Sequence, residues 1–453
     1  MLFNSIEFII YFLPLTLFVY YFLNKNKLIQ LAKGWLVIAS LFFYSFWNIK
    51  YLPLIIGSML FNYSIGTTLN NYESTHLKIN RKLVLVFGIT VNLLLLSYYK
   101  YFDFFVSNFN YALQTQFNSL HIILPLGISF FTFTQIAYLV DAHKQEVKEA
   151  DFLNYALFVT FFPHLIAGPI LHHSEMMPQF AKLRNKIFSH KNLSIGLFLF
   201  SIGLFKKVII ADNLSVFVSQ GYDIFDKLNF FESWLLSISY ALQIYFDFSG
   251  YTDMALGAAL MFNINLPINF NSPYKAHNIQ DFWRRWHMTL SRFLRDYVYI
   301  PLGGNRLGNL KTSQNLIATF LLGGFWHGAN WTFIVWGAIH GFGIITHKLW
   351  KKLNFKMPAI FAIILTFIFI NVTWVFFRAE NIHIALTMLK NMFGAHGFLL
   401  PKISHGHILT QNIYSLALND ITNTFGIPVI VCNSARILYS FSILCLEYLM
   451  ATN

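Results

Sequence analysis

The run DFWRRWHMTLSRFLRDYVYIPLGG, residues 281–304, lies between the stretch FDFSGYTDM (246–254), which is predicted to be an acidic turn, and the apolar segment FLLGGFWHGANW (320–331). These segments place charges, two histidines and paired tryptophans in a chain that is otherwise strongly apolar. An ionisable group inside a membrane segment marks a functional site by default. We therefore expect the chemistry of this protein to lie within residues 247–331.

The composition identifies a polytopic membrane protein. Of 453 residues, 56% are apolar and 11% are charged, and the mean hydropathy is +0.53, whereas about a quarter of the residues in soluble domains are charged. The net charge of +13 comes from Lys and Arg in short loops between apolar runs, which indicates the positive-inside pattern rather than a nucleic-acid site. Only Cys432 and Cys445 are present, which excludes a disulfide framework and a central thiol nucleophile.

The apolar runs predict an all-α protein with roughly 11–13 transmembrane or re-entrant helices. The first run lacks a basic start and a small-residue cleavage site, so we interpret it as a span rather than a signal peptide. The run at 152–171 contains two prolines and a histidine and is predicted to be re-entrant. The candidate spans are 6–23, 34–48, 51–69, 83–99, 121–140, 152–171, 192–211, 231–246, 251–263, 314–327, 331–347, 358–377 and 436–450.

Basic clusters predict the orientation of these spans. Lys and Arg concentrate in loops, while residues 100–120 carry only Lys100. The positive-inside pattern places the clusters on the cytoplasmic side. They lie at 25–33, 78–82, 182–191, 284–311 and 348–356.

A helical hairpin is predicted between Lys311 and Lys348, with its turn at 328–330. Two helices of roughly 16 residues would each be about 24 Å long and would barely cross the hydrocarbon. Because both lysines belong to cytoplasmic clusters, His327, next to the turn, is expected near the far face.

His327 is the first candidate for the chemistry. Its segment is otherwise built of Leu, Gly and aromatic residues, so the imidazole either hydrogen-bonds within the bundle or lines a cavity. An imidazole titrates near neutrality and suits a general base that takes a proton from an attacking hydroxyl. Small residues at 323–324 and 328–329 are expected to leave room for a substrate. A structural histidine is the alternative.

Residues 281–300 are predicted to form one two-faced helix. At about 100° per residue the arginines fall on one arc with Asp281, the large apolar side chains on the opposite arc, and His287 on the seam. This helix would lie on anionic headgroups, or form a cytoplasmic collar whose guanidinium groups bind a phosphorylated donor. The residues assigned to donor binding are Arg284, Arg285, Arg292, Arg295, Trp283 and Trp286.

Asp247 and Asp253 stand at the join of two apolar segments. They could cap a helix that begins near Thr252, orient a histidine, or form a structural ion pair, and we favour the ion pair. His164 and His340 are further intramembrane histidines. We expect both to pack between helices rather than to catalyse.

Six strings carry a resemblance to a known family. They are ILPLGISFFTFTQIAYLVD (123–141), FFPHLIAGPI (161–170), QIYFDFSGYTDMALG (243–257), LPINFNSPY (266–274), DFWRRWHMTLSRFLRDYVYIPLGGNR (281–306) and LGGFWHGANWTFIVWGAIHG (322–341). The sequence resembles the membrane-bound O-acyltransferase family, in the branch of the alginate, peptidoglycan and teichoic-acid acylation membrane proteins. The two histidine strings are specific in combination, and neither alone is decisive.

The resemblance implies a transmembrane acyltransferase with helices around a central tunnel. Such a protein takes an acyl group from a cytoplasmic thioester donor and passes it to a hydroxyl on the far side. The two active-site histidines of the family correspond to His287 in RRWHMTLS and His327 in FWHGANW. The family's tunnel converges on the second of these.

Two departures from the family are visible. An arginine is expected shortly after the string AGPI, where this chain has His172 and His173. From about Gly397 onward the chain stops resembling the family. We therefore expect an acyltransferase domain over residues 1–395 and a divergent tail over 396–453 with one possible span.

The function expected from these observations is O-acetyl transfer. Acetyl-CoA would be the co-substrate, with no metal or other cofactor, and the acceptor would be an envelope polysaccharide or peptidoglycan reached through a periplasmic partner protein. The expected location is the bacterial cytoplasmic (inner) membrane, with lipids and no nucleic acid as further partners. The alternatives are a transporter or flippase with a histidine relay, although we find no inverted repeat, and a catalytically silent scaffold for an exported transferase.

Overall fold

The computed structural model describes residues 1–71, 80–147, 151–398, 402–404 and 407–409, so the candidate span at 436–450 lies outside the described residues. The all-α prediction is confirmed for the body of the protein; two short strands, β1 (Lys402–Ser404) and β2 (His407–Leu409), pair antiparallel. The chain divides into two compact units. The first contains Met1–Val208, Phe248–Asn271 and Trp286–Thr312, and the second contains Ile209–Asp247, Ser272–Arg285 and the chain from Ser313 on.

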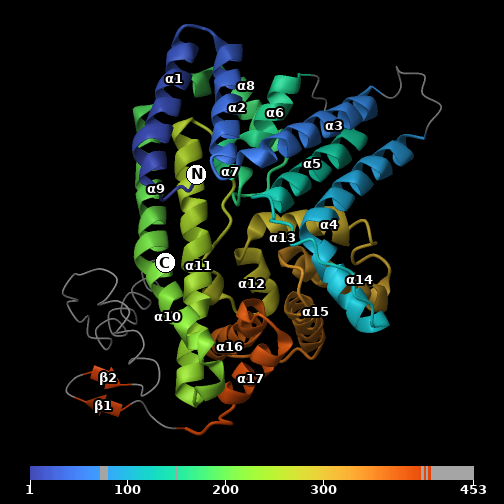
Figure 1. Ribbon diagram of the computed structural model, residues 1–453, viewed down its shortest axis with the longest axis vertical. Helices are drawn as coiled ribbons and strands as arrows, with labels where there is room; N and C mark the ends of the chain where they lie inside the picture. The colour runs from blue at the N-terminus through green and yellow to red at the C-terminus, as the bar shows by residue number, and fades with distance from the viewer. Residues whose placement is uncertain (72–79, 148–150, 399–401, 405–406, 410–453) are drawn as a thin grey trace. The chain divides into compact units, whose positions relative to one another are not determined.

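The first unit is built mainly from the N-terminal helices. Helices α3, α4 and α5 lie side by side, and α1 packs along α2 (Figure 1). Short 3-10 or π segments are labelled η. The elements are η1 (Glu7–Phe12), α1 (Leu13–Lys25), α2 (Ile29–Ser45), η2 (Ile49–Tyr51), α3 (Leu52–Asn70), α4 (Arg81–Leu113), α5 (Ile128–His143), α6 (Phe152–Thr160), α7 (Phe162–Leu165), α8 (His173–Ala181), η4 (Leu183–Lys186), α9 (His190–Phe205), α13 (Met288–Leu294) and η8 (Arg295–Tyr299).

The second unit is built mainly from the C-terminal helices. Helix α15 packs against α16 and α12, and α16 packs against α17. Its elements are α10 (Asp212–Asp223), η6 (Phe225–Lys227), η7 (Pro273–Lys275), α12 (Ile279–Arg285), α15 (Trp331–Lys352), α16 (Ala359–Arg378) and α17 (Ile382–Met392). Three further elements have residues in both units, namely η5 (Lys206–Ala211), α11 (Phe230–Met261) and α14 (Gly308–His327).

The chain is a multi-pass membrane protein. Among the described residues, five helical stretches are long and apolar enough to cross a bilayer. Each overlaps a span predicted from the sequence, although Arg81–Leu113 and His190–Asp223 extend well beyond the predicted 83–99 and 192–211. The stretches are Glu7–Lys25, Ile49–Asn70, Arg81–Leu113, His190–Asp223 and Ala359–Arg378.

The run at 152–171, which was predicted to be re-entrant, contains a break in its helix. Helix α6 ends at Thr160, and Phe161 has a non-helical backbone before the single turn of α7. His164, in this turn, is buried, and its Nε2 lies 2.9 Å from the carbonyl oxygen of Phe158. This contact satisfies the ring within the fold, as expected for a packing histidine.

The acidic segment 246–254 was predicted to be a turn, and this prediction is wrong. Helix α11 runs through it without a break, so the candidate spans 231–246 and 251–263 form one helix of 32 residues. Thr252 lies inside that helix, and therefore neither aspartate caps a helix start there.

Long-range packing explains why α11 continues. A side chain on Gly250 or Gly257 would collide with the backbone of α9, so these glycines let the two helices approach closely. Asp253 forms an ion pair with Lys206, at 2.7 Å between Oδ2 and Nζ. The ion-pair role that we favoured for Asp253 is thus confirmed.

The predicted hairpin around residues 328–330 is confirmed. Helix α14 ends at His327 and α15 begins at Trp331, with the Asn330 side chain accepting a hydrogen bond from the Thr332 backbone N–H at 3.0 Å. The helices are longer than expected, at 20 and 22 residues. A 20-residue helix is about 30 Å long, which matches the hydrocarbon thickness.

Candidate functional site

The predicted helix over 281–300 is wrong, because it breaks at His287. Helix α12 ends at Arg285, His287 has the left-handed backbone angles φ 44° and ψ 54°, and α13 begins at Met288. A left-handed residue is uncommon outside glycine and turns the chain sharply. The break separates the arginines: Arg284 and Arg285 lie in the second unit, and Arg292 and Arg295 in the first.

His287 is buried in the first unit, with 2% of its surface exposed, and belongs to a small cluster of polar side chains. Its Nδ1 is 3.2 Å from the Asn269 Oδ1, and its ring meets Phe248 edge to face at 4.7 Å between centroids. Asn269 Oδ1 also accepts hydrogen bonds from the backbone N–H and the hydroxyl of Thr289, at 3.1 and 3.0 Å. Thr289 in turn accepts a hydrogen bond from the Ile170 backbone N–H.

These contacts fix the tautomer of His287. The Thr289 backbone N–H donates to Asn269 Oδ1, so that atom is an acceptor, and His287 Nδ1 must carry the hydrogen it donates. The lone pair of the ring then lies on Nε2. Burial lowers the pKa of His287 to about 3, so the ring is neutral at pH 7. A neutral, weakly basic imidazole orients a reacting group better than it removes a proton.

Tyr297, Asp141 and His172 form a second polar cluster in the first unit, of which the sequence reasoning noted only His172, as a departure from the family. The Tyr297 hydroxyl donates to Asp141 Oδ1 at 2.7 Å and lies 2.9 Å from His172 Nδ1, which is 3.3 Å from Asp141 Oδ2. Burial and the Asp141 carboxylate raise the pKa of Tyr297, so the phenol stays protonated. His172 therefore occupies a hydrogen-bonded position in the loop where the family leads us to expect an arginine.

The arginines differ in their contacts. Arg292 forms a bidentate ion pair with Glu175, at 2.6 and 2.9 Å between guanidinium nitrogens and carboxylate oxygens. Arg295 pairs with the neighbouring Asp296. Arg285 pairs with Asp281 one helical turn away, at 3.0 Å, while Arg284 is exposed. Arg284 and Arg295 are thus the two exposed arginines of the four, and Arg295 is already paired with Asp296.

His327 lies within an aromatic box in the second unit. Its ring meets the rings of Trp326, Trp336 and Phe377 at 4.9, 5.2 and 5.0 Å between centroids, each in an edge-to-face arrangement. Helices α14, α15 and α16 each supply one wall. The imidazole is partly exposed, unlike the fully buried His340 on α15. His327 therefore combines a positioned ring with access for a reacting group.

Gly324 and Gly328 do not leave open space beside His327, contrary to our expectation. A side chain on Gly324 would collide with the Phe333 carbonyl oxygen, and one on Gly328 would collide with the Phe333 ring. These glycines allow α14 and α15 to pack closely, which is the ordinary use of small residues between membrane helices.

His340 and the two donor-binding tryptophans are buried. Trp283 donates from Nε1 to His340 Nδ1 at 3.2 Å, so the His340 ring is held by the end of α12, as predicted for a packing histidine. Trp286, in the first unit, packs edge to face on Phe270 at 5.0 Å. Each tryptophan is thus held within its own unit, and contact of either one with a donor stays a prediction.

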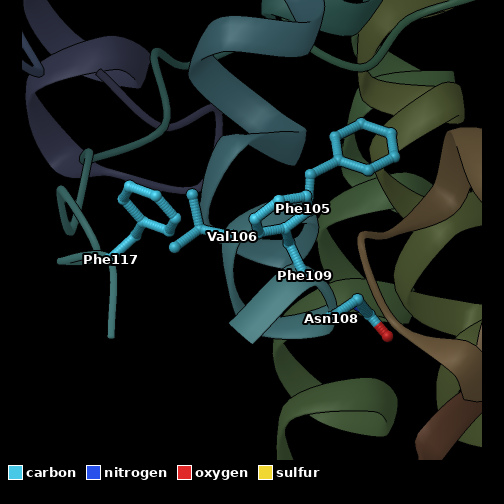
Figure 2. Close-up of a pocket in the computed structure, with 5 residues that line it drawn as sticks. All are labelled: Phe105, Val106, Asn108, Phe109 and Phe117. Atoms are coloured by element: carbon cyan, nitrogen blue, oxygen red, sulfur yellow. The ribbon is translucent and has the colours of Figure 1, made fainter. Parts of the chain in front are cut away.

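An apolar hollow at the C-terminal end of α4 is a poor candidate for chemistry. It has a volume of about 560 Å³ and is lined by Phe105, Val106, Asn108, Phe109 and Phe117. Figure 2 shows the first four side chains on the helix and Phe117 on the segment that follows. An amide is the only polar side chain in this lining, so the hollow offers no acid, base or nucleophile. Among the described residues, no cluster of His, Cys, Asp or Glu could hold a metal ion either.

Comparisons with known proteins confirm the family resemblance. The family model for membrane-bound O-acyltransferases matches residues 41–385. The peptidoglycan O-acetyltransferase of Helicobacter pylori is 52% identical over 436 residues, which cover 89% of this chain and 82% of that protein. The probable alginate O-acetylase of Pseudomonas putida is 38% identical, covering 94% and 87%. The teichoic acid D-alanyltransferase of Bacillus subtilis is 30% identical over 58% of this chain and 71% of that protein.

Proposed function

The chain belongs to the membrane-bound O-acyltransferase family, and we propose that it moves an acetyl group from cytoplasmic acetyl-CoA to a hydroxyl on an exported cell-envelope polymer. The observation that carries this proposal is the 52% identity to a peptidoglycan O-acetyltransferase over nearly the whole chain. Peptidoglycan is therefore the first acceptor to test. An alginate-like polysaccharide is the second, on the 38% identity to an alginate O-acetylase.

The reaction assigns distinct tasks to the two histidines. The acceptor hydroxyl attacks the thioester carbonyl carbon, a C–O bond forms, the C–S bond breaks, and the thiol leaves. His327 takes the hydroxyl proton and returns it to the departing sulfur, as its aromatic box holds the ring but leaves it partly exposed. His287, neutral and hydrogen-bonded to Asn269, orients a reacting group through Nε2.

Location and partner follow from the same proposal. The loops with Lys and Arg face the bacterial cytoplasm, where acetyl-CoA is found, and the inner membrane holds the protein. A periplasmic partner protein receives the acetyl group or presents the polymer on the far side. The family's central tunnel would connect the two faces.

Labelling of the two halves of the donor tests enzyme against transporter. In inverted membrane vesicles or cells, we expect radiolabel from the acetyl group in the far-side polymer, while label in the CoA moiety stays on the cytoplasmic side. A flippase or transporter would instead deliver intact donor or an intact polymer precursor across the membrane. Recovery of either intact molecule on the far side would refute acyl transfer.

Removal of two arginines tests the donor assignment. Arg284→Ala combined with Arg285→Ala should raise the KM for acetyl-CoA about 10-fold or more with little change in kcat, since these contacts bind the donor before chemistry begins. Arg306→Ala, an exposed arginine of the same basic cluster, is the matched control and should leave KM unchanged. A collapse of kcat at constant KM would mean that the arginines act in catalysis or in the fold.

A further inference from the structure

A groove in the second unit is lined by none of the residues described above for His287 and His327. It has a volume of about 800 Å³, within the usual range for ligand sites. Its walls are the C-terminal half of α15, the first half of α16, the turn that joins them, and the start of α12. From Ile339 to Lys351 the groove follows α15 for about 18 Å at the standard helical rise.

One end of the groove is cationic. Lys351 and Lys356 line it together with His347 and His277, and no carboxylate is among its lining residues. Both lysines are exposed, and no salt bridge to either occurs in the part of the chain that the structure describes. This end of the groove therefore suits an anionic group, since its lysines are exposed and form no salt bridge among the described residues.

The other end is apolar, and its floor is closed. Phe342, Leu365 and Phe369 line it, and Phe369 meets the His340 ring at 5.8 Å, which closes the floor. Gly343 has no side chain at the point where a Cβ would come within 2.7 Å of the Phe369 ring. The glycine thus allows the floor to form against α15.

The groove opens on a surface that faces lipid. Helix α16 is a candidate span, and its exposed residues Ile360, Phe361, Ile364, Leu365 and Ile368 form one face of it. Phe342, at the mouth of the groove, is 57% exposed. A strongly polar, soluble ligand would bury its polar groups against these hydrocarbon walls at a cost, whereas an acyl chain matches them.

Aromatic rings mark the level of the headgroups. Trp350 and Phe355 lie edge to face at 5.4 Å beside the two lysines. Tryptophan is enriched at the membrane interface, where one end of the ring is apolar and the other wet. The cationic end of the groove is accordingly placed at the interface and the apolar end in the hydrocarbon.

We propose that this groove binds one anionic phospholipid, with the phosphate at Lys351 and Lys356 and an acyl chain along α15 and α16 toward Phe369. Basic pockets between membrane helices on the cytoplasmic side recognise anionic headgroups in this way. The site is independent of the acyl-transfer chemistry. The bound lipid holds the cytoplasmic ends of α15 and α16 together.

Lipid retention measured on the full-length protein tests the site. The protein is placed in nanodiscs of phosphatidylcholine with one-fifth phosphatidylglycerol, and co-purified phosphatidylglycerol is measured by native mass spectrometry after detergent extraction. Lys351→Gln with Lys356→Gln should lower its retention about 25-fold, because each of the two lysines that contact the phosphate contributes about fivefold. Lys348→Gln with Lys352→Gln removes the same charge from the same helix end outside the groove and should leave retention unchanged.

A second variant tests the acyl chain rather than the headgroup. Ala362→Trp fills the groove from α16 while keeping both lysines, and it should also lower retention. Equal losses in the two lysine pairs, or no loss in the Lys351 and Lys356 pair, would overturn the site. Displacement of the phosphatidylglycerol by inorganic phosphate or acetyl-CoA at millimolar concentration would overturn the lipid as occupant.

Discussion

Replacement of His327 by glutamine should lower acyl transfer per folded molecule about 100-fold or more, the scale for loss of a positioned general base. Glutamine keeps a polar side chain that donates and accepts hydrogen bonds, but it takes no proton near pH 7. The aromatic box of Trp326, Trp336 and Phe377 packs on a flat side chain of similar size, so the fold should tolerate the change. Protein level and thermal stability should stay near wild type.

The measurement is specific activity in detergent, with acetyl-CoA and a simple hydroxyl acceptor, normalised to folded protein. His383→Gln, an exposed histidine on α17, is the matched control and should behave as wild type. If His327 is only a packing group, the substitution would reduce abundance and leave the specific activity of the surviving protein intact. Near-normal activity in a well-folded variant would remove His327 from the mechanism.

The sequence predicted the hairpin that carries His327 because its signals are local. Two apolar segments flank a turn at residues 328–330, and Asn330 is a strong helix cap. The aromatic box was not predictable, because Phe377 comes from α16, some 50 residues further along the chain. Contacts of that kind depend on packing between helices, which periodicity does not report.

The helix predicted over the arginine segment was wrong, again because a contact distant in sequence decides the local structure. Residues 281–300 have a strong helical period, yet the helix breaks at His287. There the Asn269 side chain contacts the His287 ring and accepts a hydrogen bond from the Thr289 backbone N–H. Asn269 stands about twenty residues earlier, in the string LPINFNSPY. That string was noted for its resemblance to the family, but nothing within it singles out Asn269 as the partner of a histidine.

Acidic residues were similarly misplaced by local reasoning. The segment 246–254 has a Gly and two aspartates, which is typical of a turn. In the structure Gly250 packs against α9, and Asp253 forms an ion pair with Lys206, directly after α9. The predicted ion pair was correct, because a charge between apolar helices requires a partner. The predicted turn was wrong, because glycine in membrane helices also allows two helices to pack closely.

Replacement of His287 by asparagine should also lower acyl transfer about 100-fold or more, with a different signature in pH. Asparagine tolerates the left-handed backbone at this position better than most residues, so the break between α12 and α13 should persist. Since burial lowers the pKa of His287 to about 3, the wild-type ring stays neutral from pH 5 to 8, and its titration should contribute no change in rate across that range.

Asn269→Asp provides the diagnostic partner to that variant. Aspartate keeps an oxygen where His287 Nδ1 and the Thr289 backbone N–H point, but its negative charge favours the protonated imidazole and raises the pKa of His287. Protonation removes the lone pair from Nε2, so activity should fall as pH decreases through the raised pKa and recover above it. A rate of Asn269→Asp that follows the wild-type pH profile, together with near-normal activity in His287→Asn, would show that His287 shapes the fold and does not orient a reacting group.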